Sequence, residues 1–224
     1  MANPLTIAID GPAASGKSTL AQALAQRLGY LYFDTGAMYR AVTLAALRRG
    51  LNMADEAALA KVAGEVEIDL RPASRADGRL NDVFMDGEDC TWAIRTKEVD
   101  AAVSAVSAFP SVRRALTEQQ QRIGRRGAVV MAGRDIGTVV LPGAELKIFL
   151  DASLEERAKR RHTESLERGE SEPYEQILKS LRERDQIDSS RVVAPLRPAE
   201  DAIQLKTDGV GREQVLDQVL GLVR

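Results

Sequence analysis

The stretch GPAASGKST at residues 11–19 constrains the fold of this chain more than any other feature. It fits the pattern GxxxxGK[ST] at every fixed position, and it follows the short apolar run LTIAI at residues 5–9. The β-branched residues of that run predict a buried strand, and leucines at four-residue spacing through 17–28 predict a helix that ends at Gly29. A strand, a glycine-rich turn and a helix in this order are the context that a phosphate-binding loop requires.

The residues of this loop suit the phosphates of a nucleotide. Backbone N–H groups of a glycine-rich turn and the positive end of a helix attract anions, and Lys17 adds a compact cation. A lysine at a helix start opposes the helix dipole unless an anion is present, so a turn used only for packing would not explain it. Ser18 is placed to bind Mg²⁺. The residues that we expect to contact the nucleotide are Gly11, Pro12, Ala13, Ala14, Ser15, Gly16, Lys17, Ser18 and Thr19.

Strands and helices alternate along most of the chain. Further apolar runs read as buried strands at 30–33, 128–132, 145–151 and 202–208. Amphipathic or charged helical patterns separate them. This alternation predicts an α/β fold in three layers, with a central parallel sheet flanked by helices on both faces.

One region departs from this alternation. In residues 65–92 the hydrophobic period changes to two, and Asp77-Gly78 and Asp86-Gly87 are typical of tight turns between strands. We expect a small antiparallel β insertion there.

Composition excludes several classes of protein. Hydrophobic residues make up 44% of the chain, but no stretch approaches the roughly 18 apolar residues of a membrane span. The net charge of −2 gives no global basic field for nucleic acid or anionic membranes. No secretory signal is visible, and Cys90 is the single cysteine. We expect a cytoplasmic monomer that binds neither nucleic acid nor membrane.

A phosphate-binding loop is shared by kinases, GTPase switches and motor ATPases, so other residues must decide the reaction class. The chain has no NKxD sequence, which recognises guanine in common GTPases. A kinase whose acceptor carries a phosphate needs a second anion site, which arginines can supply through bidentate contacts. Arginines cluster at 157–161 and at 182–191. Because a single charged run is also typical of a solvated helix face, these clusters alone do not decide the class.

Longer motifs resemble those of the bacterial cytidylate kinases, a branch of the nucleoside monophosphate kinases. The resemblance runs nearly end to end, and GRDIGTVV at 133–140 and ERDQIDSSRVVAPL at 183–196 are its most specific parts. The other parts are IAIDGPAASGKST at 7–19, DTGAMYR at 34–40, GEDCTWAIRTKEV at 87–99, AFPSVRRAL at 108–116 and KIFLDASLEERAKRR at 147–161. The resemblance implies transfer of the γ-phosphoryl group of ATP to CMP or dCMP, with Mg²⁺ as the cofactor.

The same resemblance implies roles for individual residues. The acceptor phosphate would be held by Arg40, Arg134 and Arg191. The cytosine edge would be recognised by Ser104, Arg113 and Asp135, and the sugar would be contacted by Thr35, Arg184 and Asp188. Arg160 and Arg161 would belong to a lid that closes over ATP. The residues that we expect to act on the transferred phosphoryl group are Lys17, Arg134, Arg160 and Arg191.

The resemblance also implies how one unit of 224 residues is organised. The core would comprise residues 1–34, 110–152 and 190–224. A monophosphate-binding region would span 35–109 and include the β insertion, a short helical lid would span about 153–172, and a substrate-contacting helix would span 173–189.

Two positions depart from the family pattern. Ala132 stands where many members have an acidic residue near Mg²⁺, so we take Asp34 as the replacement ligand, with Asp10 as the second choice. Thr35 stands where serine is common, which leaves the preference between ribose and deoxyribose open.

Two other functions stay open from the residues. One is a kinase for another small metabolite, such as shikimate or a coenzyme precursor. The other is a nucleotide-dependent switch or binding module, which predicts tight nucleotide binding without acceptor-stimulated turnover. Phosphoryl transfer needs few acid–base or nucleophilic side chains, and the chain has one histidine and one cysteine. We expect Cys90 to be a packed thiol and His162 to lie at the surface.

Overall fold

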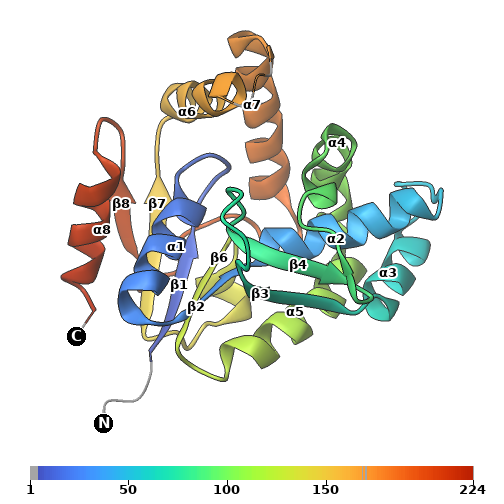
Figure 1. The fold of residues 1–224 in the computed structure, drawn as a ribbon, viewed down its shortest axis with the longest axis horizontal. Helices are drawn as coiled ribbons and strands as arrows, with labels where there is room; N and C mark the ends of the chain where they lie inside the picture. The colour runs from blue at the N-terminus through green and yellow to red at the C-terminus, as the bar shows by residue number, and fades with distance from the viewer. Residues whose placement is uncertain (1–4, 168, 170, 224) are drawn as a thin grey trace.

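The five-stranded sheet at the centre of the protein is fully parallel. The structure is a computed structural model that describes residues 5–167, 169 and 171–223. The strand order is β2-β6-β1-β7-β8, and each neighbouring pair is parallel (Figure 1). The strands are β1 (Thr6–Asp10), β2 (Leu31–Asp34), β6 (Val129–Gly133), β7 (Leu146–Asp151) and β8 (Ile203–Lys206). Every strand expected for this sheet is confirmed, to within two residues at each end.

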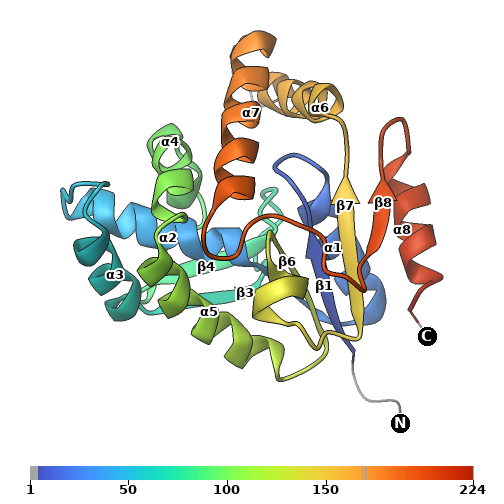
Figure 2. The same ribbon diagram turned by 180° about the vertical axis from the view of Figure 1, so that it is seen from behind.

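Helices cover both faces of the sheet, which confirms the three-layer α/β prediction (Figures 1 and 2). The α-helices are α1 (Lys17–Leu28), α2 (Thr35–Arg48), α3 (Glu56–Glu65), α4 (Lys97–Val106), α5 (Pro110–Gly124), α6 (Leu154–Glu167), α7 (Tyr174–Ser190) and α8 (Arg212–Leu220). None of these described helices has the length and apolar character needed to cross a membrane.

The central strands β1 and β6 are apolar along most of their length because each of them faces two cores. Ile7 and Ile9 of β1 pack with α1 and α8, whereas Ala8 between them packs with the helices on the other face. Parallel strands buried on both faces carry continuous apolar runs instead of alternating ones. This explains why LTIAI and AVVMA are recognisable in the sequence.

The antiparallel insertion is confirmed as a three-stranded sheet in the order β3-β4-β5. Its strands are β3 (Ile68–Pro72), β4 (Asn81–Met85) and β5 (Glu88–Asp89). Asp86 and Gly87 both have positive φ, at 51° and 83°, as the turn between β4 and β5 requires. The Asn81 side-chain amide donates to the Tyr32 carbonyl at 3.2 Å, which attaches the insertion to the central sheet.

A π-helical turn, η2 (Ile136–Val140), follows β6, where the sequence analysis expected no helix. The carboxylate of Asp10, at the end of β1, accepts hydrogen bonds from the backbone N–H groups of Ile136 and Gly137, both at 2.8 Å. These two groups begin the turn and have no partner within it. One side chain therefore satisfies both of them.

Helices α6 and α7 stand above the carboxyl edge of the sheet, over the loop that precedes α1 (Figure 1). Ala13 of that loop packs in one cluster with Ala158 of α6 and with Ile177 and Leu181 of α7. The helix pair is therefore fixed against the phosphate-binding loop. Positions 168 and 170 of the expected lid lie outside the described residues.

Candidate active site

The loop Gly11–Thr19 lies at the carboxyl end of β1 and has the conformation of an anion-binding turn. Gly11 has φ of 151°, and a Cβ at this position would lie 2.1 Å from the Leu150 carbonyl oxygen on β7. Gly16 caps α1 with φ of 93° and offers no side-chain hydrogen bond to the first N–H groups of the helix. The buried hydroxyl of Ser15 makes no hydrogen bond within the described residues. Donors in this loop are therefore left for an added ligand.

Lys17 is buried in this loop, with 7% of its surface exposed. Its ammonium group donates to the Pro12 carbonyl at 2.7 Å. Burial holds the pKa of Lys17 well below its usual value, and the positive charge of Arg134 lowers it further, while Asp34 opposes this. An anion beside the ammonium would reverse both unfavourable effects.

Two arginines of α6 hold this helix against the phosphate-binding loop. Arg157 donates to the Ala13 carbonyl at 3.2 Å and pairs with Asp185 of α7 at 2.6 Å. Arg160 donates to the Ser15 carbonyl at 3.3 Å and to the Thr207 carbonyl at 2.6 Å. Arg160 therefore lies beside the loop, and Arg157 makes a second contact with it.

Arg161, which was expected at the nucleotide, faces α4 in this structure. Its guanidinium lies 3.6 Å from one oxygen of Asp100, whose other oxygen accepts from Arg40 at 2.5 Å. Arg40 also donates to the Ile94 carbonyl at 3.2 Å. One carboxylate thus lies between an arginine of α6 and an arginine of α2.

Asp188 of α7 is the carboxylate that joins two of the expected acceptor arginines. Its side chain is 2% exposed and accepts from Arg134 at 2.8 Å and from Arg191 at 2.5 Å. Burial opposes the ionisation of Asp188, but Arg134 and Arg191 hold its pKa below the usual value. Arg134, which lies 54 positions before Asp188, is therefore brought next to the Asp188–Arg191 pair.

Positive charge exceeds negative charge around this cluster. Burial, followed by the charge of Arg134, lowers the pKa of Arg184 to about 10. The Nε atom of Arg184 is buried and makes no hydrogen bond within the described residues. Arg134 and Arg184 also both lower the pKa of Lys17, so these cations share one region. Unpaired buried donors and repelling cations are the chemistry of a site that binds an anion.

Arg113 and Asp135 form a second buried pair, with their nearest N and O atoms 2.5 Å apart. The Arg113 guanidinium also donates to the Ser107 carbonyl at 3.1 Å and lies over the ring of Tyr39, 5.3 Å from its centroid. Ser104 is within one helical turn of Ser107, whose hydroxyl donates to the Ser104 carbonyl at 3.0 Å. Ser104, Arg113 and Asp135 therefore lie in one neighbourhood.

The threonine expected at the sugar is buried, and its hydroxyl has a protein partner. Thr35 Oγ1 donates to the Ala132 carbonyl at 2.9 Å, which ties the start of α2 to β6. Only the lone pairs of this oxygen stay available to a ligand.

The residues expected to bind Mg²⁺ supply few protein oxygens. Both oxygens of Asp10 are used by the N–H groups of η2, so Asp10 does not fit this role. Asp34 uses one oxygen to cap α2 at Gly36 N, and Ser18 is half-buried at the start of α1. No group of three or more potential His, Cys, Asp or Glu ligands exists among the described residues. One hydroxyl and one carboxylate suit an ion that keeps its waters and binds mainly to substrate phosphates.

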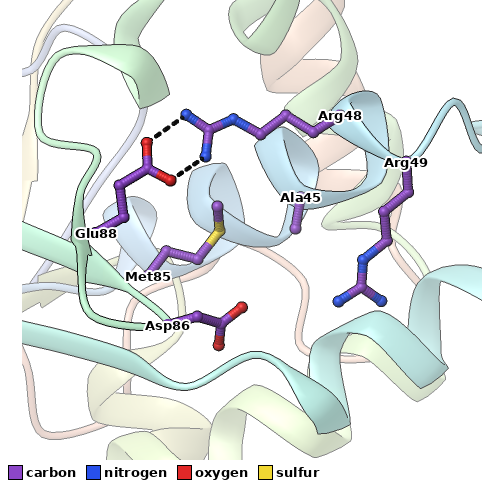
Figure 3. Close-up of a pocket in the computed structure, with 6 residues that line it drawn as sticks. All are labelled: Ala45, Arg48, Arg49, Met85, Asp86 and Glu88. Atoms are coloured by element: carbon purple, nitrogen blue, oxygen red, sulfur yellow. Dashed lines mark hydrogen bonds and ion pairs between the residues drawn. The ribbon is translucent and has the colours of Figure 1, made fainter.

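A hollow of about 240 Å³ lies away from these residues, between α2 and the turn from β4 to β5 (Figure 3). Arg48 and Glu88 form a bidentate pair at 2.9 Å beside it, and Ala45, Met85, Asp86 and the second arginine, Arg49, also line it. Arg48 and Arg49 are each paired with a glutamate, and their side chains are 41% and 42% exposed. It shares no residue with the candidate site.

The chain is similar to known proteins along nearly its whole length. A sequence model of the family described as cytidylate kinase matches residues 7–224. The cytidylate kinase of Chloroflexus aggregans is 56% identical over 92% of this chain and 88% of its own length. That of Geobacillus sp. strain WCH70 is 52% identical over 100% of this chain and 98% of its own length.

Among solved structures, an uncharacterised protein from Eubacterium ventriosum is similar to this chain, with a TM-score of 0.52 at 11% identity over 98% of each chain. At that identity the likeness concerns the fold alone.

Proposed function

The chain belongs to the cytidylate kinase family, and we propose that it transfers the γ-phosphoryl group of ATP to CMP or dCMP. The observation that carries this proposal is the second cation cluster: Arg134, Arg184 and Arg191 gather around Asp188, opposite the phosphate-binding loop. A protein that only bound ATP would have no use for a second anion site.

On the donor side, ATP would lie in the loop Gly11–Thr19. The N–H groups at the start of α1 and the Lys17 ammonium would contact its outer phosphates. Arg160 is held next to the loop by the Ser15 carbonyl and would contact the phosphates from there. Arg161 would have to leave Asp100 to reach them.

On the acceptor side, Arg40, Arg134 and Arg191 would hold the phosphate of CMP, and Arg184 and Asp188 would contact the sugar, with Thr35. The Arg113–Asp135 pair, with Ser104, would recognise the cytosine edge. Cytosine differs from uracil by an amino donor at C4, which a carboxylate accepts. A buried polar site of this kind discriminates strongly, because the wrong base would leave its groups unpaired.

In the transfer step an oxygen of the acceptor phosphate forms a bond to the γ-phosphorus of ATP, and the bond from that phosphorus to the β-phosphate oxygen breaks. The products are ADP and CDP or dCDP. The attacking oxygen is already anionic at neutral pH, so no general base is needed. Lys17, Arg134, Arg160 and Arg191 would align the two phosphates and neutralise charge.

Mg²⁺ is the expected cofactor, with Ser18 and Asp34 as its protein ligands. When bound, the ion supplies neutralisation of the outer phosphates of ATP.

An acceptor panel tests the proposal. Purified protein is mixed with ATP, Mg²⁺ and each of CMP, dCMP, UMP, AMP, GMP and shikimate, and ADP is measured. We expect ADP to form fastest with CMP or dCMP. Fastest turnover with any other acceptor contradicts the cytosine assignment, and ATP binding without ADP formation favours a nucleotide-binding module.

The proposal also assigns a role to each segment of the chain. We take 153–172 as the lid, 173–189 as a substrate-contacting helix and 35–109 as the monophosphate-binding region. The contact of Arg161 with Asp100 supports this reading, because it joins α6 to α4 at 3.6 Å. The expected monomer is tested by light scattering, and the cytoplasmic location by cell fractionation.

A further inference from the structure

Ser107 contacts two of the arginines that are proposed to bind the acceptor, Arg113 and Arg191. It ends α4 as the C-terminal cap, and 8% of its surface is exposed. Ser107 lies outside the family motifs, which occupy 87–99 and 108–116 in this region.

Ser107 contacts both arginines through different atoms. Its hydroxyl oxygen accepts from Arg191 Nη2 at 2.8 Å, and its carbonyl oxygen accepts from Arg113 Nη1 at 3.1 Å. The hydroxyl proton is donated to the Ser104 carbonyl at 3.0 Å. Because a guanidinium only donates and a carbonyl only accepts, the orientation of this hydroxyl is fixed.

The contact also fixes the guanidinium of Arg191. The two N–H bonds of Nη2 are used by Ser107 Oγ and by Asp188 Oδ1, the latter at 2.5 Å. Two acceptors on one nitrogen define the plane of the group. Arg191 Nε is buried and has no partner within the described part of the chain, so it stays available for an added anion.

We infer that Ser107 is a positioning residue for the acceptor, because it holds the arginine of the phosphate and the arginine of the base at a fixed separation. The inference rests on the proposed function and deepens it. A nucleoside monophosphate has its base and its phosphate at opposite ends. A residue that joins both binding groups sets the length of ligand that satisfies them together.

The two contacts of Ser107 can be separated by substitution. Ser107→Ala removes the hydroxyl, and with it the contact to Arg191, but it keeps the carbonyl that holds Arg113. The phosphate of CMP should then be bound less well, while the base is recognised as before. A misplacement of about 1 Å in a positioning group costs up to about 10²-fold in rate.

The experiment compares CMP, which carries a phosphate, with cytidine, which does not. In Ser107→Ala we expect the KM for CMP to rise about tenfold, as loss of a hydrogen bond to a charged group implies. The inhibition constant of cytidine, which lacks the phosphate, should stay within about twofold of the wild-type value, and so should the KM for ATP.

Ser111→Ala is the matched control. The Ser111 hydroxyl donates to Glu56 at 2.6 Å on the neighbouring helix, so its loss removes a comparable bond outside the arginine network. We expect this control to keep the KM for CMP. Both variants should unfold at nearly the same temperature, which separates a positioning effect from a loss of stability.

A double-mutant cycle tests whether Ser107 acts on CMP binding through Arg191. In an Arg191→Ala background, Ser107→Ala should add no further loss of CMP affinity by calorimetry, since it acts through Arg191. An unchanged KM for CMP in Ser107→Ala, an equal weakening of cytidine, or additive losses in the cycle would each overturn the inference. If the wild-type protein binds CMP but does not turn it over, the proposed function fails and the calorimetric cycle still tests the contact. Absence of CMP binding in the wild type would overturn both.

Discussion

The Arg113 guanidinium and the Asp135 carboxylate form an ion pair in which both side chains are less than 8% exposed. In a buried pair, removal of one partner leaves a charge without compensation. We therefore expect Asp135→Asn to lower the free energy of unfolding by about 3 kcal/mol, measured in urea.

The same variant should lose specificity, because the carboxylate is the proposed acceptor for the cytosine amino group. The ratio of kcat/KM for CMP to that for UMP is expected to fall by at least about tenfold. Asp201→Asn is a suitable control, since Asp201 pairs with Lys147 while 65% of its own side chain is exposed. A control that loses as much stability as Asp135→Asn would contradict the importance of burial.

Lys17 should be a residue that the reaction needs and the fold does not. Its ammonium is buried with one neutral partner, the Pro12 carbonyl, and its pKa is lowered by burial and by Arg134. We expect Lys17→Met to reduce turnover of ATP and CMP by about 10²–10³-fold or more. The free energy of unfolding should stay equal or rise, because a desolvated cation is removed. Equal losses of stability and activity would contradict this.

Asp10 should give the protein a characteristic pH dependence. Burial raises the pKa of Asp10 from 3.8 to about 6, against the lowering effect of the N–H groups of Gly137 and Ile136. The folded protein therefore binds this proton more tightly than the unfolded chain does. The resulting stabilisation is present at acid pH and is lost as the pH rises through about 6.

The measurement compares the wild type with Asp10→Asn in urea at pH 5 and pH 7.5. Relative to the variant, the wild type should gain about 1.4 kcal/mol on going to the lower pH. The comparison cancels the titration of the other carboxyl groups. A difference that is constant with pH, or that grows toward pH 7.5, is the contrary result.

The fluorescence of Trp92 should show whether the β insertion keeps its ion pairs. Its indole N–H donates to Asp77 at 3.1 Å, and Asp77 pairs with the buried Arg79 at 2.8 Å. Arg79 also pairs with Asp82 at 2.8 Å and with Asp89 at 3.2 Å. In Arg79→Ala three carboxylates lose their shared cation, so we expect them to separate and the tryptophan emission to shift to longer wavelength.

This loosening should also reach the acceptor site. Arg40 donates to the Ile94 carbonyl in η1 (Ala93–Arg95), the turn that follows Trp92. The KM for CMP is therefore expected to rise in Arg79→Ala while the KM for ATP stays constant. Because Trp92 is the only tryptophan, its fluorescence and the kinetics can be compared directly. An unchanged emission spectrum would argue against the connection.

The elements that were predictable from the sequence are those with local causes. The helix from Lys17 to Leu28 begins and ends at glycines with left-handed conformations, and its leucine spacing is visible in the sequence. The turn η2 was not predictable, because its first N–H groups are satisfied by Asp10, more than 120 residues earlier in the chain.

Some residues of the candidate site could likewise be identified from the sequence, and others could not. The arginines were found through motifs that occupy contiguous stretches, and the structure brings Arg134, Asp188 and Arg191 together. Ser107 was missed because it lies outside every motif, and Arg157 lies within a motif that does not reveal its contact with the Ala13 carbonyl. Each acts through backbone or side-chain atoms whose partners are fixed only by tertiary packing.

Gly11 has a consequence for how such sequences change over time. A side chain there would collide with the Leu150 carbonyl oxygen, so the close approach of the loop to β7 excludes every other residue. This constraint belongs to the architecture and persists without any nucleotide. A duplicated copy of this chain that had lost its reaction would be free to replace Lys17, yet it would still have to keep Gly11. In such a copy Gly11 would remain because the packing of the loop on the sheet requires it, and Lys17 could be replaced because no reaction requires it.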